Sequence, residues 1–176
     1  MAAPANQLKP LALLGGAAGA VGGWLLSSYC GANLLLPGLA LILLLVVFAK
    51  SPVRPRYFVG AIAVTAAHLA WFVAGAAILG NWSATLLDIV ALAAGITWLW
   101  VRPGLASTLF LGAVQGLSLA ANAYQLLTVP VGSAPHRALT VHVLFRVLAL
   151  VGLTVGFVQF RRARLAPPPL PAEAAA

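Results

Sequence analysis

The stretch "HVLFRVLALVG", residues 142–152, places a histidine and an arginine four residues apart in an otherwise apolar run. The run extends over about residues 138–160. A helix needs roughly 20 apolar residues to cross a hydrocarbon core of about 30 Å. The stretch therefore predicts a transmembrane helix that contains a permanently charged side chain, Arg146.

The composition of the whole chain indicates a membrane protein and argues against a soluble domain. Of its 176 residues, 62% are hydrophobic and 7% are charged, whereas about a quarter of a soluble domain is charged. The apolar residues come in successive runs of roughly 20, without the alternating ten-residue segments of barrel strands. The expected fold class is all-α, a polytopic transmembrane helix bundle of about six spans.

The formal net charge of +8 does not indicate a nucleic-acid-binding protein. The basic residues stand singly or in short groups at the ends of apolar runs, which is typical of topology signals in membrane proteins. The single cysteine, Cys30, excludes an intrachain disulfide and a cysteine metal cluster.

Short polar breaks divide the chain into apolar segments of span length. The break "KSPVRPR" (50–56) combines cations with prolines, and "PVGSAPHR" (130–137) is the longest internal loop. Residues 1–165 are expected to form a single transmembrane bundle, and residues 166–176 a disordered cytoplasmic tail rich in proline and alanine. The six expected spans are about 11–29, 34–49, 57–80, 84–101, 105–128 and 138–160.

The basic residues also predict the orientation. With six spans, only Arg137 falls on one side of the membrane, and the positive-inside rule then places both termini in the cytoplasm of a cell (inner) membrane protein. An alternative stays open, in which the residues that follow Lys9 form a cleaved signal peptide. The basic residues on the expected cytoplasmic side are Lys9, Lys50, Arg54, Arg56, Arg102, Arg161, Arg162 and Arg164.

The first apolar segment carries Gly15, Gly19 and Gly23 at four-residue spacing, hence on one helical face. Small residues at this spacing allow two helix backbones to approach closely. The face is expected to pack inside the bundle, and the alternative is self-association or contact with a membrane protein partner.

Polar residues of the last three segments are expected to converge in the outer half of the membrane. Asp88 follows the outer start of its segment by about 7 Å at 1.5 Å per residue, and Asn122 and Gln125 precede the outer end of theirs. His142 and Arg146 lie about one and two turns below the same surface. On the fifth segment a polar stripe falls within about 100° of arc, and it consists of Thr108, Gln115, Ser118, Asn122 and Gln125.

Asp88 is the only carboxylate within any expected span and is therefore the expected partner of Arg146. An unpaired arginine near the bilayer centre costs roughly 2.5–3.5 kcal/mol on insertion scales. Two interpretations follow: a structural contact between the fourth and sixth helices, or a polar pocket that presents Arg146 to an anionic small molecule or lipid. The ligand-binding hypothesis assigns the pocket to Asp88, Gln115, Asn122, Gln125, His142 and Arg146.

His68 is expected near the middle of the third segment, at a different depth from this polar cluster. A hydrogen bond to a neighbouring helix is the expected role. No H-x-x-x-H or E-x-x-H pairing occurs, so neither a metal site nor a cofactor is expected.

The sequence contains no phosphate-binding loop, dinucleotide fingerprint or serine-nucleophile motif. The first hypothesis is a small ligand-binding or transport-related membrane subunit. The alternatives are a membrane-embedded enzyme that uses the same polar cluster, and a structural subunit of a larger membrane complex.

Overall fold

The computed structural model describes residues 35–50 and 57–165, and this part of the chain is helical without strands. Four of its helices are long and apolar enough to cross a membrane, and the apolar part of α2 is shorter, Pro37–Phe48. The expected first span, 11–29, lies outside the described residues, together with Gly15, Gly19, Gly23 and Cys30, so the count of six spans stays a prediction. The helices are α2 (Leu35–Lys50), α3 (Val59–Leu79), α4 (Trp82–Val101), α5 (Leu105–Thr128) and α6 (Ala134–Leu165).

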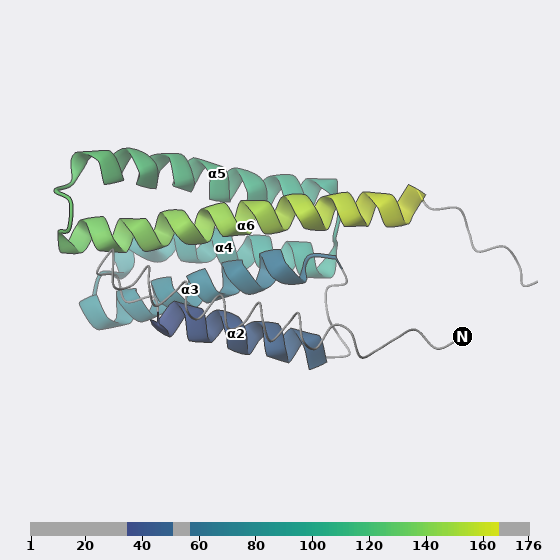
Figure 1. Ribbon diagram of the computed structural model, residues 1–176, viewed down its shortest axis with the longest axis horizontal. Helices are drawn as coiled ribbons and strands as arrows, with labels where there is room; N and C mark the ends of the chain where they lie inside the picture. Colours follow the sequence, from purple (N-terminus) through teal and green to yellow (C-terminus); the bar gives the residue numbers. More distant parts are fainter. Residues whose placement is uncertain (1–34, 51–56, 166–176) are drawn as a thin grey trace, which may run out of the picture.

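Helices α3 to α6 form a closed ring in which each helix packs against two other helices of the ring, and α2 packs on the outside against α3 (Figure 1). The ring order is α3, α4, α5, α6, and α6 closes it against α3. The side chains on its outer surface are mainly apolar: Leu87 is 81% exposed and Leu127 is 86% exposed. Water would not favour such a surface, whereas lipid tails are its natural surroundings.

Helix boundaries follow local signals in the sequence. Helix α3 ends at Leu79 and is followed by Gly80, whose φ of 67° is readily adopted only by glycine. Gly132, with a φ of 81°, turns the chain between α5 and α6.

The last helix is longer than the sequence predicted. It starts at Ala134, four residues before the expected start, and continues through Arg161, Arg162 and Arg164 to Leu165. The loop expected over 130–137 is correspondingly shorter. At about 48 Å, this helix exceeds the hydrocarbon thickness, so its basic end can extend into the polar region beyond it.

The interior of the ring is divided along its length. The end where α4 connects to α5 is packed with large apolar side chains, among them Phe58, Ile62, Leu99, Leu111 and Leu153. Close backbone approach supports this packing, because α6 lies against α3 at Gly152 with no room for a side chain. Toward the other end, buried polar side chains lie among the apolar ones. This polar half holds the candidate site.

Candidate functional site

An ion pair between α4 and α6 lies at the centre of the polar half. The Nη2 of Arg146 donates to the Oδ1 of Asp88 at 3.0 Å. The arginine side chain is fully buried, and that of the aspartate is 33% exposed. The predicted pairing of these two residues is confirmed. Its physical cause is that a guanidinium inside an apolar bundle requires a counterion.

Helix α5 adds two neutral side chains to the ion pair. The Nη1 of Arg146 donates to the Oε1 of Gln115 at 3.2 Å, and Ser118 Oγ donates to Asp88 Oδ1 at 3.2 Å. The Nε2 of Gln115 in turn donates to Thr65 Oγ1 on α3 at 3.3 Å. We call Thr65, Asp88, Gln115, Ser118 and Arg146 the polar network. It joins all four helices of the ring by hydrogen bonds.

Two histidines meet one turn beyond this network. His68 Nε2 on α3 lies 2.8 Å from His142 Nδ1 on α6, so one ring nitrogen donates a hydrogen bond to the other. The prediction that His68 lies at a different depth from the cluster was wrong. Because α6 begins at Ala134, His142 lies about two turns into its helix and reaches the level of His68.

An aromatic ring connects the histidine pair to the arginine. The ring of Phe72 stacks on His142 with 4.5 Å between centroids, and the guanidinium carbon of Arg146 lies 5.7 Å from the centre of the same ring. The ring of His68 also lies against Phe72, with 4.8 Å between centroids, so both histidines and Arg146 surround one phenylalanine. Sequence reasoning missed Thr65 and Phe72, although their spacing to His68 (three and four residues) places all three on one face of α3.

Two of the residues expected in the site, Asn122 and Gln125, form no side-chain hydrogen bond with the network in the described structure. Asn122 lies one turn beyond Ser118 on α5 and is half-buried, and its Nδ2 donates no hydrogen bond to any described residue. Gln125 is exposed near the end of α5. Thr108, also part of the expected stripe, bonds Gly104 O at the opposite end of the helix. A stripe of polar residues identifies one face of a helix. It does not show which part of that face is covered by neighbouring helices.

Three buried side-chain atoms have no hydrogen-bond partner among the described residues: His68 Nδ1, Asn122 Nδ2 and Arg146 Nε. Buried polar atoms usually find a protein or water partner because leaving one unsatisfied costs about 1–3 kcal/mol. Two of the three, the amide and guanidinium nitrogens, are donors only. They could bind acceptor atoms of water or of a ligand.

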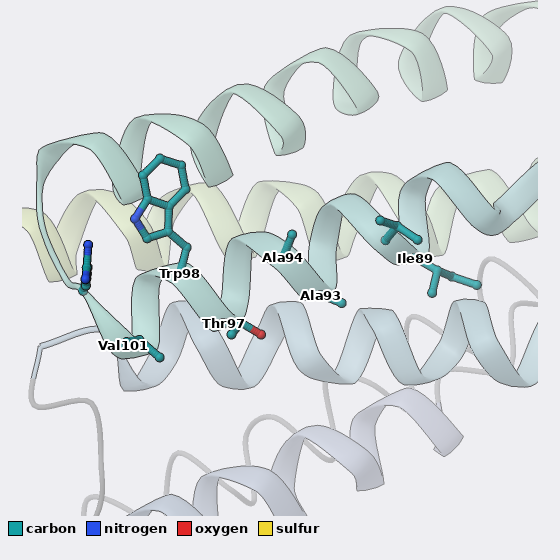
Figure 2. Close-up of a pocket in the computed structure, with 8 residues that line it drawn as sticks. Ile89, Ala93, Ala94, Thr97, Trp98 and Val101 are labelled. Atoms are coloured by element: carbon teal, nitrogen blue, oxygen red, sulfur yellow. The ribbon is translucent and has the colours of Figure 1, made fainter.

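Two grooves on the surface of the bundle lie apart from the polar network. One, of about 720 Å³, runs along α4, where Trp98 projects toward α5 (Figure 2). The other, of about 420 Å³, lies between α5 and α6 toward the apolar half and includes Gly112 and Phe157. Neither groove is lined by a residue of the network. The residues that line the α4 groove are Ile89, Val90, Ala93, Ala94, Thr97, Trp98, Val101 and Arg102.

The described residues do not bring three histidine, cysteine, aspartate or glutamate side chains together as metal ligands. Comparison of the sequence with protein-family models, with curated proteins and with solved structures gave no match.

Proposed function

We propose that this chain is a multi-pass protein of the inner membrane that binds or transports a small anionic ligand in the outer half of α4 to α6. The supporting observation is the unused donor of Arg146. Its Nη1 and Nη2 are bonded within the network, while its buried Nε has no acceptor among the described residues. Buried donors without acceptors are rare in folded proteins and need a water or ligand partner.

The chemistry of the free donors favours an anion that carries oxygen atoms. A guanidinium presents N–H groups in a planar fork that matches carboxylate and phosphate oxygens. Asn122 adds an amide donor on the neighbouring helix, one turn from Ser118. The partly exposed Asp88 would be the route of access, since it is the member of the ion pair that reaches the surface of the bundle.

The orientation in this proposal rests on the basic residues. Arg102 and the arginines at 161, 162 and 164 belong to the end of the bundle where α4 connects to α5 and α6 terminates (Figure 1). Arg137 belongs to the other end. Under the positive-inside rule the first end is cytoplasmic, with both termini, and the polar half faces outward.

A second candidate function is purely structural. Both terminal nitrogens of Arg146 are bonded within the protein, which favours a contact that holds α4, α5 and α6 of this bundle together. The two proposals differ in one respect. A binding site responds to added anion, whereas a structural contact does not.

The test is the thermal stability of the full chain in nanodiscs of zwitterionic phosphatidylcholine, with acetate, sulfate or phosphate added at constant ionic strength. We expect one of these anions at saturation to raise Tm by a few degrees, since about 1 kcal/mol corresponds to roughly 2–4 °C in a protein of this size. The effect should vanish in the charge-neutral double variant Asp88→Asn with Arg146→Gln. It should persist in Arg137→Gln, a control that removes an exposed arginine of the same helix.

Nanodiscs with anionic phosphatidylglycerol form the second arm of this test. Stabilisation by phosphatidylglycerol alone, lost in the double variant, would identify a lipid headgroup as the ligand. Equal responses of the wild type and the double variant to every anion and to the lipid would contradict the binding proposal and support the structural one.

A further inference from the structure

The histidine pair has a chemical property that neither the ion pair nor the proposed anion site uses. His68 is fully buried, and its Nε2 lies 2.8 Å from His142 Nδ1. A neutral imidazole has one N–H and one bare nitrogen. In the neutral pair, the nitrogens that face each other share one hydrogen, so one of the two outward nitrogens is bare.

The bare nitrogen can accept a proton without breaking the hydrogen bond. If His68 donates through Nε2, its Nδ1 is bare, and that atom has no partner among the described residues. If His142 donates through Nδ1, its own Nε2 is bare instead. A proton from solution that adds to either bare nitrogen gives the same cation, in which one imidazolium shares its N–H with the other ring. The central bond then becomes charge-assisted and stronger.

The charges around the pair decide whether it can hold that proton. Arg146 lies one helical turn from His142 on α6, and Asp88 lies 3.0 Å from Arg146. Helix α5 contributes the neutral side chains of Gln115, Ser118 and Asn122, and the described side chains of α2 (37–48) are apolar. In the ion pair, +1 and −1 sum to zero. An added imidazolium would leave the low-dielectric interior with an uncompensated positive charge, which is costly.

We propose that the His68–His142 pair is a proton-binding site controlled by the charge at Asp88 and Arg146, so that an anion bound there is taken up together with a proton. The proposal rests on the proposed anion site. A bound anion of charge −1 would bring the summed charge of Asp88, Arg146 and the anion to −1. One proton on the histidine pair then restores the total to zero. The ligand of the histidine pair is the proton itself, and the coupled process is proton-linked anion binding.

The coupling can be tested without the anion, because Arg146→Gln leaves Asp88 as the anion. The experiment is a pH titration of ¹⁵N-histidine chemical shifts, which distinguish imidazole from imidazolium, on the full chain in nanodiscs. His68→Gln and His142→Gln variants assign the signals. His136, in the first turn of α6, provides an internal reference.

In Arg146→Gln we expect the pair to take up its proton at a pH about one unit or more above that of the wild type, a tenfold or greater gain in proton affinity. The substitution removes a like charge one turn from His142 and leaves the opposite charge of Asp88 uncompensated, and nearby charges shift the titration of a buried group by this much. The double variant Asp88→Asn with Arg146→Gln, again neutral, should return to the wild-type titration. Asp88→Asn alone, with net charge +1, should shift it the other way, and this variant keeps the test decisive if Arg146→Gln does not fold.

Identical titrations in all four proteins would overturn the proposal. So would two histidines that titrate independently while the reference histidine behaves alike throughout. This readout needs no ligand, so it is separate from the anion test. A protein that fails to bind anions but shows the charge-dependent shift contradicts the proposed function, and with it proton-linked anion binding, while it supports control of the histidine pair by the charges of Asp88 and Arg146.

Discussion

At the scale of single residues, the structure explains how the bundle tolerates Arg146. Its terminal nitrogens reach one carboxylate and one amide, each on a different helix. The carboxylate partner was predictable from the sequence, because the chain has two acidic residues and one of them lies outside every apolar segment. Gln115 was included in the expected site, but its bond to Thr65 could not be predicted, since a sequence does not show which helix faces which.

Gln115→Leu should destabilise the bundle, because the buried Nη1 of Arg146 and the hydroxyl of Thr65 both lose their partner. Each unsatisfied buried group costs about 1–3 kcal/mol. We expect a loss of about 2–4 kcal/mol in the free energy of unfolding, measured by SDS titration of the protein in detergent micelles.

The control for this variant is Gln125→Leu, the same substitution on the same helix at an exposed position. It should change the free energy of unfolding by no more than about 0.5 kcal/mol. Equal effects at the two positions would mean that Gln115 does not bond Arg146.

At the scale of elements, the packing of α6 on α3 sets the position of the site. A Cβ placed on Gly152 would lie 2.9 Å from the backbone nitrogen of Ala61 and 3.0 Å from its Cα. Ala61 is one turn from Thr65 on α3, so the same contact fixes the distance between the helices that carry the two histidines. The sequence shows a glycine at position 152, but it does not show that the backbone of α3 lies against it.

Gly152→Ala should therefore lower stability, because backbone atoms cannot move aside as the end of a flexible side chain can. Overpacking of this kind costs about 1–3 kcal/mol, more than the gain of up to about 1 kcal/mol in helix propensity. The measurement is again SDS-induced unfolding, compared with Gly116→Ala on α5.

A Cβ at Gly116 would meet no atom within 4 Å. That variant should be as stable as the wild type or more stable, because only the helix propensity changes. If Gly152→Ala were as stable as Gly116→Ala, α6 and α3 would lie farther apart than the structure shows.

At the scale of the whole molecule, the bundle has an apolar half and a polar half. Composition and run length were enough to predict an all-helical membrane protein, and the start and end of α5 agree with the predicted segment 105–128. Alternation of chain direction also predicted that Asp88 and Arg146 lie at one depth, and their ion pair confirms this. It failed for His68, since an error of four residues at the start of α6 shifts its side chains by about 6 Å.

Other features of the whole molecule depend on contacts between helices, and these could not be predicted from a single sequence. The closed ring α3 to α6, with α2 packed outside on α3, is one of them. Because each helix exposes most of its surface as apolar side chains, periodicity hardly distinguishes the face toward lipid from the face toward protein. The polar residues gave the clearest indication of which helix faces point into the bundle. This indication was limited to the polar half.

The most direct test of the account is a double-mutant cycle on the ion pair, measured as the free energy of unfolding of Asp88→Asn, Arg146→Gln and the double variant. Removing one partner of a buried pair leaves an uncompensated charge and costs about 3–5 kcal/mol. Removing both should recover most of that loss, so the double variant should be more stable than either single variant. Losses that add to within about 0.5 kcal/mol would mean that Asp88 and Arg146 do not meet, and the polar site would lose its centre.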